Sequence, residues 1–258
     1  MNPPINTDGA QNNNGSIPSI DLLGLKIHCV DMDDTLKLLK VFIESSQPHM
    51  VVTADSSGIV LAQSDNELMD IVNNADLVTP DSSGILWGAR KLGTPLKNRV
   101  SGVDIAAHLC RMSSEDGFSV IFLGAAPGVA ELAAENLSRE YPRMKVAGVH
   151  HGYFTEADDP EIVEKIRQSG ASVLFVAMGI PKQEKWIRRY LDEMGVSIAI
   201  GVGGSFDVFS GRVKRAPEWM QHHGLEWVYR LAKNPRKISK VSTLPKYWAM
   251  VMRESRSK

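Results

Sequence analysis

The sequence has few of the features that mark secreted or membrane-spanning proteins. It contains two cysteines, Cys29 and Cys110, and both lie within apolar segments. Two cysteines exclude a disulfide framework and fit a reducing compartment. No apolar run approaches the roughly 20 residues that span a bilayer. Residues 1–18 are polar and lack a basic start followed by an apolar stretch. We therefore expect a disordered tail there instead of a signal peptide, and a protein that stays in the cytoplasm.

Several motifs of nucleotide, hydrolase and metal chemistry are also missing. The sequence has neither a G-x-S-x-G elbow nor a P-loop. The segment FLGAAPG (122–128) falls short of G-x-G-x-x-G, and no acidic residue stands at the end of the next predicted strand. This argues against a nicotinamide-dependent oxidoreductase. The histidine pairs at 150–151 and 222–223 have no cysteine partners at zinc spacing, so we expect no metal there.

One acidic cluster has two interpretations. Asp31, Asp33 and Asp34 form a D-x-D-type pattern whose oxygen ligands would suit magnesium or manganese beside a diphosphate. The favoured interpretation is that these acids begin a helix and complement its dipole.

Charge is unevenly distributed along the chain. The net charge is −1 over 258 residues, yet residues 212–258 contain 12 Lys and Arg against three Glu, a net charge of +9. The rest of the chain therefore carries −10. A basic C-terminal segment favours an anionic partner such as phospholipid headgroups, nucleic acid or a diphosphate. A solvated helical face is the alternative that charge alone slightly favours.

Short apolar runs alternate with amphipathic stretches through most of the chain. The predicted strands are Leu25–Val30, Met50–Thr53, Asp76–Thr79, Phe118–Leu123, Lys145–Val149, Val173–Ala177 and Ser197–Val202. Unbroken apolar strands such as VLFVAM are typical of parallel sheets that are covered on both faces. Helix starts are indicated by a capping box at Ser64 and Glu67, by a capping Asp159 before Pro160, and by Pro181. The pattern predicts an α/β fold with a mostly parallel sheet.

The pattern changes after Gly211, where strand signals end. Aromatic, aliphatic and basic residues continue at helical spacing, with breaks at Gly224, Pro235 and Pro245. We predict a helical appendage over residues 212–258, with the composition of an interfacial helix. The alternative is ordinary docking on the α/β body, through Leu225, Trp227, Val228 and Leu231.

Polar residues and glycines gather where the predicted strands end. The four unusual segments are Thr53–Ser56, Pro80–Gly84, Met178–Glu184 and Gly201–Asp207. Ligands of open parallel sheets bind beyond the carboxyl ends of the strands, so each segment is a candidate binding element. Asp81 precedes a helix predicted from about Ser83, and the residues alone favour helix capping over catalysis for it.

Taken together, these segments resemble the WecG/TagA/CpsF family of glycosyltransferases. The matching stretches run in fixed order from about Thr53 to Leu231 and are NNADLVTPDSSGILWGARKLGTPLKNRVSGVD, FLGAAPGV, HGYF, VAMGIPKQEKWI, GVGGSFDVFSGRVKRAP and GLEWVYRL. The resemblance implies an inverting, metal-independent hexosyltransferase of the EC 2.4.1 type, without a cofactor. Its donor would be a UDP-sugar of the N-acetylmannosamine type or a related hexose. Its acceptor would be a polyprenyl-diphosphate-linked sugar in cell-surface polysaccharide synthesis.

The resemblance also assigns roles to residues. Asp81 matches the general base and Thr53 its partner, and one base suffices for inversion because it deprotonates the attacking hydroxyl. The positions that match donor-binding residues are Asp55, Arg99, Tyr153, Gln183, Gly203, Gly204 and Asp207, with Tyr153 and Asp207 at the uridine. Those that match cations stabilising the leaving UDP are Arg230, Arg236, Lys237 and Lys240. The chain departs from the family at Asp55, usually Asn, at Ser82, usually Gly, and at Lys237 and Lys240, where arginine is common.

We therefore predict a Rossmann-like body over residues 19–211 and a basic appendage over 212–258 that completes the active site. The appendage would bind the anionic inner face of the plasma membrane peripherally and reversibly. Nucleic acid is not expected as a partner, and assembly into a homo-oligomer is left open. Two rivals are kept: a non-catalytic UDP-sugar-binding module of a polysaccharide assembly complex, and an oxidoreductase acting on nucleotide sugars.

Overall fold

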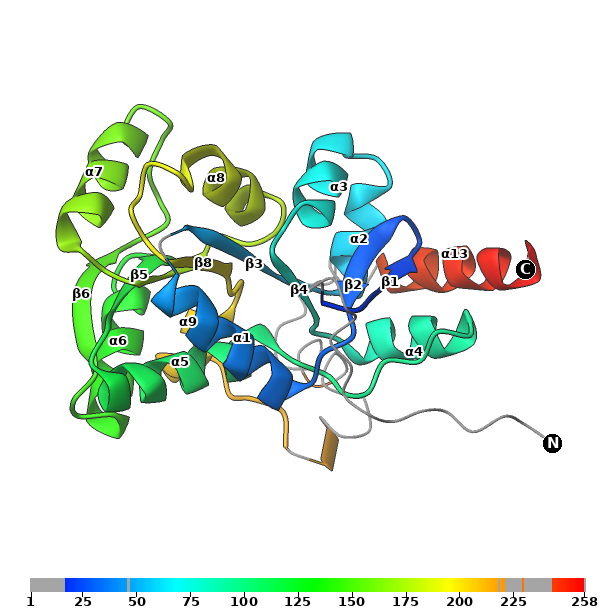
Figure 1. Ribbon diagram of the computed structural model, residues 1–258, viewed down its shortest axis with the longest axis horizontal. Helices are drawn as coiled ribbons and strands as arrows, with labels where there is room; N and C mark the ends of the chain where they lie inside the picture. The colour runs from blue at the N-terminus through cyan, green and yellow to red at the C-terminus, as the bar shows by residue number, and fades with distance from the viewer. Residues whose placement is uncertain (1–16, 46, 218, 221–228, 230–242, 258) are drawn as a thin grey trace.

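The protein is built around one six-stranded parallel sheet with helices on both faces (Figure 1). The computed structural model describes residues 17–45, 47–217, 219–220, 229 and 243–257. The sheet strands are β3 (His49–Ala54), β4 (Leu77–Pro80), β5 (Ser119–Gly124), β6 (Lys145–His150), β7 (Val173–Ala177) and β8 (Ile198–Gly201). They lie in the order β4-β3-β8-β7-β5-β6, and every neighbouring pair is parallel. The α/β fold expected from the sequence is confirmed.

The helices form two layers. The described helices are α1 (Met32–Glu44), α2 (Ser56–Ala62), α3 (Asn66–Asn73), α4 (Ser83–Lys91), α5 (Gly102–Asp116), α6 (Val129–Glu140), α7 (Asp159–Ser169), α8 (Lys182–Tyr190), α9 (Ser205–Phe209) and α13 (Thr243–Ser257). One hydrophobic cluster joins the sheet to α1, α5, α6 and α9. The other joins it to α2, α3, α4, α7, α8 and α13. Both faces of the sheet are therefore buried.

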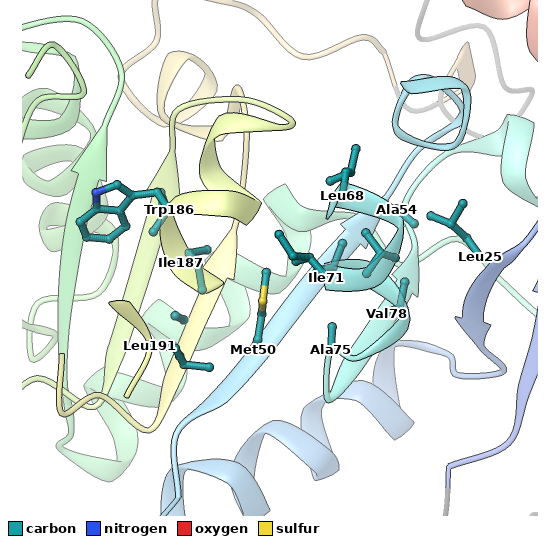
Figure 2. Packing of buried hydrophobic residues seen from close by; sticks show 14 of the residues in the cluster. Leu25, Met50, Ala54, Leu68, Ile71, Ala75, Val78, Trp186, Ile187 and Leu191 are labelled. Atoms are coloured by element: carbon teal, nitrogen blue, oxygen red, sulfur yellow. The ribbon is translucent and has the colours of Figure 1, made fainter. Parts of the chain in front are cut away.

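Two-sided burial explains why the strands are apolar without alternation. All five residues of β7 are buried, and successive residues belong to opposite clusters: Leu174 faces one and Phe175 the other. Figure 2 shows Met50 of β3 between Ile71 of α3 on one side and, on the other, Ile187 of α8 and Leu191 at the C-cap of that helix. Packing on both faces holds each strand in place and thereby positions the loop that follows it at the carboxyl edge of the sheet.

The segment predicted as the first strand does not join the parallel sheet. Leu25–His28 (β2) pairs instead with Ser19–Leu22 (β1), an unpredicted strand, in an antiparallel hairpin. Leu23 and Gly24 form its turn, with φ of 57° and 85°. A two-residue hairpin turn of this hand needs positive φ at both positions, which leucine adopts at a cost. The sequence offers Leu-Gly where Asn-Gly would have signalled the turn, so the hairpin was missed.

Two predicted helix caps are wrong. Asp65, not Ser64, caps α3, since its Oδ1 accepts from the Leu68 N–H at 3.0 Å. Asp159 is not a cap but the first residue of α7, and it is buried. Its two carboxylate oxygens accept from Trp186 Nε1 at 2.8 Å and Tyr190 Oη at 3.0 Å, so it ties α7 to α8. An acid before proline signals a helix start but does not reveal what its side chain contacts.

The C-terminal region is described in part. Residues 243–257 form α13, which contacts α2 and α4 through the buried Tyr247 and Val251. Most of the predicted appendage, with the docking residues 225, 227, 228 and 231, lies outside the described residues, as do residues 1–16 of the predicted tail. The boundaries at residues 18 and 211 stay predictions. None of the described helices has both the length and the apolar character of a membrane span.

A buried histidine ties the hairpin to the edge of the sheet. His28 Nδ1 accepts from the Val78 N–H at 2.8 Å, which requires a neutral ring protonated on Nε2. Burial and the nearby Lys26 lower the pKa of His28 from 6.5 to about 4. Protonation of this ring therefore weakens the contact between β2 and β4.

Replacing His28 with asparagine should flatten the pH dependence of stability. Between pH 4 and 6.5 the unfolded chain binds more protons at this residue, because its folded pKa is the lower one. The unfolding free energy of the native protein thus falls as pH drops through that window, by up to about 3 kcal/mol. Asparagine keeps an acceptor near the Nδ1 position and does not titrate. Urea unfolding at about pH 7 and about pH 4.5 measures this fall in the unfolding free energy for the native protein and for His28→Asn. An equal fall in the two proteins would contradict the prediction.

Candidate functional site

A pocket opens at the carboxyl edge of the sheet, where four neighbouring strands end. It is lined from β3 by Thr53 and Asp55, from β4 by Asp81, and from β7 and β8 by Gln183 and Gly203, which follow those strands. The segment between α4 and α5 adds Arg99 and Ser101. The chain leaves β3 for α2 on one face of the sheet and leaves the neighbouring β8 for α9 on the other face. Ligands of open α/β sheets bind in the crevice between two such neighbouring strands.

Most of the predicted site residues converge on this pocket. The predicted residues that line it are Thr53, Asp55, Asp81, Arg99, Gln183, Gly203 and Gly204. Tyr153 follows the edge strand β6, is 72% exposed and does not line it. Asp207, in the first turn of α9, also stands outside the lining. The four predicted leaving-group cations, at positions 230, 236, 237 and 240, lie outside the described residues.

Asp81 occupies the turn between β4 and α4 without capping the helix. Ser82 is the N-cap, and its Oγ accepts from the Ile85 N–H at 3.3 Å. The backbone on either side is fixed: the Asp81 N–H donates to Ala54 O at 2.9 Å, and Val100 N–H donates to Pro80 O at 2.9 Å. The capping role that the residues alone favoured for Asp81 therefore belongs to its neighbour, and the Asp81 side chain contributes to the pocket wall.

Asp55 is engaged in local structure. It is the N-cap of α2, and its Oδ1 accepts from the Gly58 N–H and the Ser57 hydroxyl, each at 2.7 Å. Asparagine, the usual family residue here, also carries an Oδ1 acceptor and is as good a helix cap. The departure therefore preserves the local fold and adds a negative charge to the pocket.

Thr53 connects three elements below the pocket. Its Oγ1 donates to Gly201 O, at the end of β8, at 2.9 Å. The first residue of α5, Gly102, lies so close that an added Cβ would be 3.1 Å from Thr53 Oγ1. With its proton engaged, the Thr53 hydroxyl can still accept a hydrogen bond from a ligand. Its predicted role beside the base stays a prediction.

Gln183 holds two glycine-containing turns together. Its Oε1 accepts from the Gly179 N–H at 3.0 Å and from the Gly203 N–H at 3.1 Å. Its Nε2 donates to Glu184 Oε1 at 2.8 Å, and both side chains are buried, with Gln183 4% and Glu184 1% exposed. The amide oxygen already has two donors, so the main task visible for Gln183 is to position the turns after β7 and β8.

Three further residues line the pocket, to which the sequence interpretation gave no role of their own. Ser101 caps α5, Ser205 begins α9, and Glu184 stands beside Gln183. Glu184 belongs to the PKQE segment, but a glutamate at this position does not by itself indicate a binding site. Glutamates near the start of a helix ordinarily complement the helix dipole. Serines at helix starts are likewise common caps. Only the meeting of distant strand ends distinguishes these residues from ordinary ones.

An ion pair anchors the chain that leads toward the C-terminal region. The two terminal guanidinium nitrogens of Arg215 bind the Asp104 carboxylate, with Nη1–Oδ1 at 2.6 Å and Nη2–Oδ2 at 2.9 Å. Burial opposes ionisation of Asp104, but hydrogen bonds from Arg215 and Ser101 outweigh it and hold the pKa of this carboxyl below its usual value. The pair fixes residue 215 against the first turn of α5, next to the pocket.

The segment HGYF (151–154) follows β6, at the end of the carboxyl edge that is farthest from β4. Phe154 packs edge-on against Trp186 of α8, with ring centroids 6.2 Å apart, and Lys182 Nζ lies 5.1 Å from its ring centre. Its neighbour Gly152 passes so near β5 that an added Cβ would be 3.0 Å from Gly124 Cα. Phe154 thus anchors the segment, and Tyr153 is presented to solvent.

The acidic cluster at the start of α1 is a capping box. Asp31 Oδ1 accepts from the Asp34 N–H at 2.9 Å, and Asp34 Oδ2 accepts from the Asp31 N–H at 3.3 Å. The favoured sequence interpretation of these acids is confirmed. Across the described ranges, we find no group of three or more His, Cys, Asp or Glu side chains arranged to hold a metal ion.

Comparison with known proteins gives consistent matches over nearly the whole chain. A model of the glycosyl transferase WecG/TagA/CpsF family matches residues 20–258. Proteins of Bacillus spizizenii strain W23 and Bacillus subtilis strain 168 are each 33% identical to the chain, over 216 and 221 residues. These alignments cover 84% and 86% of this chain, and 83% and 86% of the relatives. A Staphylococcus aureus strain MW2 protein is 28% identical over 239 residues, or 92% of this chain and 93% of its own. All three are named N-acetylglucosaminyldiphosphoundecaprenol N-acetyl-beta-D-mannosaminyltransferase.

Proposed function

The chain belongs to the WecG/TagA/CpsF family of glycosyl transferases, and from that premise we propose how it transfers a sugar. The donor is a UDP-sugar of the N-acetylmannosamine type, and the acceptor is a sugar linked to polyprenyl diphosphate. Three relatives named for N-acetylmannosamine transfer to an undecaprenyl-diphosphate-linked N-acetylglucosamine support this choice. The reaction inverts the anomeric centre, needs no metal ion and serves the synthesis of a cell-envelope polymer.

The observation that carries the proposal is the place of Asp81. Three carboxylates line the pocket: Asp55, which caps α2, Glu184, which accepts from the Gln183 amide, and Asp81. Asp81 directly follows β4, shares the pocket with the glycine turn that follows β8, and leaves the capping of α4 to Ser82. An inverting transfer needs one base on the face of the sugar away from the leaving group. Asp81 is the carboxylate we assign to that role.

In the proposed reaction, the acceptor hydroxyl donates its proton to Asp81 while its oxygen attacks the anomeric carbon. The bond from that carbon to the UDP oxygen breaks, and its electron pair leaves with UDP. The donor lies along the turn at Gly203 and Gly204, where the close backbone can approach the nucleotide. Negative charge grows on the diphosphate, so nearby cations lower the barrier.

Those cations come only in part from the described pocket. Within the part of the pocket that the structure describes, Arg99 is the one cationic side chain, against the carboxylates of Asp55, Asp81 and Glu184. A diphosphate needs more positive charge than this. We assign the remainder to Arg230, Arg236, Lys237 and Lys240, in the segment that follows the Arg215 anchor.

The acceptor's lipid suggests where the enzyme works. Helix α13 exposes the cations Lys246, Arg253 and Arg256, and its Trp248, although stacked on Trp87 of α4, is still 57% exposed. Basic and aromatic side chains on one helix suit the surface of an anionic membrane. We propose peripheral binding at the inner face of the plasma membrane, which brings the pocket to a polyprenyl-linked substrate.

The proposal is tested by UDP release. Purified protein is incubated with UDP-N-acetylmannosamine and an N-acetylglucosamine-diphosphate lipid, with and without EDTA. We expect acceptor-dependent UDP release and product of inverted configuration, at the same rate in both samples. UDP binding without release would identify a non-catalytic module. Loss of activity with EDTA and recovery with manganese would overturn the metal-free reaction.

A further inference from the structure

Helix α13 touches the turn that carries the candidate base. Tyr247 is fully buried, and its hydroxyl donates to Gly84 O at 3.0 Å. Gly84 belongs to the first turn of α4, three residues beyond Asp81. Burial raises the pKa of the Tyr247 phenol, so the hydroxyl keeps its proton and remains a donor. A residue near the C-terminus thus holds the backbone next to the active site.

The contact depends on close approach at two glycines of α4. A Cβ added at Gly88 would lie 2.1 Å from Tyr247 Oη, and one added at Gly84 would lie 2.1 Å from Ser56 Oγ. A larger residue at position 88 would therefore collide with the buried Tyr247 ring, and one at position 84 would displace the Ser56 hydroxyl. The stack of Trp87 on Trp248, with centroids 4.8 Å apart and planes 10° from parallel, continues the contact along α4.

The first turn of α4 is also held from the side of α2. Ser56 Oγ and Ser82 Oγ lie 3.2 Å apart, and Ser82 Oγ at the same time accepts the capping bond from Ile85 N–H. Ser56 begins α2 directly after Asp55. Two residues that follow Asp81 are thus held by two helices: Ser82 by Ser56 of α2, and Gly84 by Tyr247 of α13.

We propose that Tyr247 is a positioning residue for Asp81, which makes turnover depend on the docking of α13. Tyr247 does not touch the substrate. Its hydrogen bond to Gly84 and the Ser56–Ser82 pair together fix the first turn of α4, so the carboxylate keeps its direction into the pocket. The inference rests on the proposed role of Asp81. It assigns to the serine at position 82 a structural task that the usual family glycine cannot perform.

The first test is Tyr247→Phe, which removes the hydroxyl and keeps the ring against Trp87. We expect kcat for UDP release to fall about 5-fold, the effect of one lost net hydrogen bond, with the donor KM unchanged. The matched control is Tyr190→Phe, which removes the partly buried hydroxyl bound to Asp159 on the other half of the sheet. The control should retain the native kcat. An unchanged kcat in Tyr247→Phe would overturn the proposal.

The second test separates positioning from general destabilisation. Tyr247→Phe is combined with Asp81→Asn, and the residual UDP release is measured at high enzyme concentration. If Tyr247 acts through the carboxylate, the 5-fold effect disappears in the double variant, because residues of one unit are not additive. The same 5-fold loss in both backgrounds would overturn the proposal while leaving the role of Asp81 intact. Near-native turnover of Asp81→Asn alone would instead overturn the proposed function and the inference with it.

Discussion

Asp81→Asn should lower kcat at least about 100-fold without disturbing the fold or donor binding. Asparagine has nearly the same shape as aspartate but cannot accept the proton of the attacking hydroxyl. The helix start survives, because Ser82 provides the cap and the residue 81 N–H keeps its bond to Ala54 O. UDP release measures kcat, calorimetric titration with UDP measures binding, and thermal unfolding checks the fold.

The control for this prediction is Asp31→Asn. Asparagine is as good an N-cap as aspartate, so α1 should form and turnover should stay native. The same variant would lose activity if the acids of residues 31–34 held a metal ion. Turnover of Asp81→Asn within a few-fold of the native enzyme would remove Asp81 from the role of base. A loss of UDP affinity in parallel with kcat would show that the carboxylate binds the donor.

The sequence was sufficient to predict the sheet, because two-sided burial leaves a clear local pattern. Val173–Ala177 is apolar at every position, and its strand lies where expected. The hairpin escaped prediction, since Leu23 adopts a positive φ that its residue type disfavours. Asp159 was assigned a local cap, whereas its partners lie 27 and 31 residues away. Patterns of spacing report local structure, and long-range partners of a polar side chain leave no such pattern.

The same distinction applies to the site. Thr53, Asp81 and Gly203 could be placed together because parallel strands end at one edge. The individual roles of these residues and of their neighbours could not be predicted, since each role depends on a single contact. The hydroxyl of Tyr247 reaches a carbonyl 163 residues earlier in the chain, and Gln183 binds a turn 20 residues later. Gln183 was expected to bind the donor, and its visible contacts support the turns that would do so.

Gln183→Glu tests whether this amide holds the donor turn. The substitution replaces Nε2, a donor 2.8 Å from Glu184 Oε1, with an oxygen that can only accept when ionised. Two buried carboxylates in contact cannot both ionise, so one pKa is raised strongly or the pair separates. Separation would release the bonds to Gly179 and Gly203. We expect the donor KM to rise at least about 10-fold at neutral pH, with a loss of stability of about 2–4 kcal/mol.

The pH dependence of this variant distinguishes the amide's geometry from its bulk. A protonated carboxyl can donate to Glu184 as the amide does, so the defect should shrink as pH falls through the raised pKa and grow as pH rises. Gln168→Glu is the matched control, since the Gln168 amide donates to Glu164 on the exposed side of α7. Water solvates both charges there, so KM and stability should be unaffected. A native donor KM for Gln183→Glu at neutral pH would mean that the turns after β7 and β8 keep their shape without this amide. In that case the strand ends and their glycines alone, not the bond to Glu184, would have to define the donor pocket.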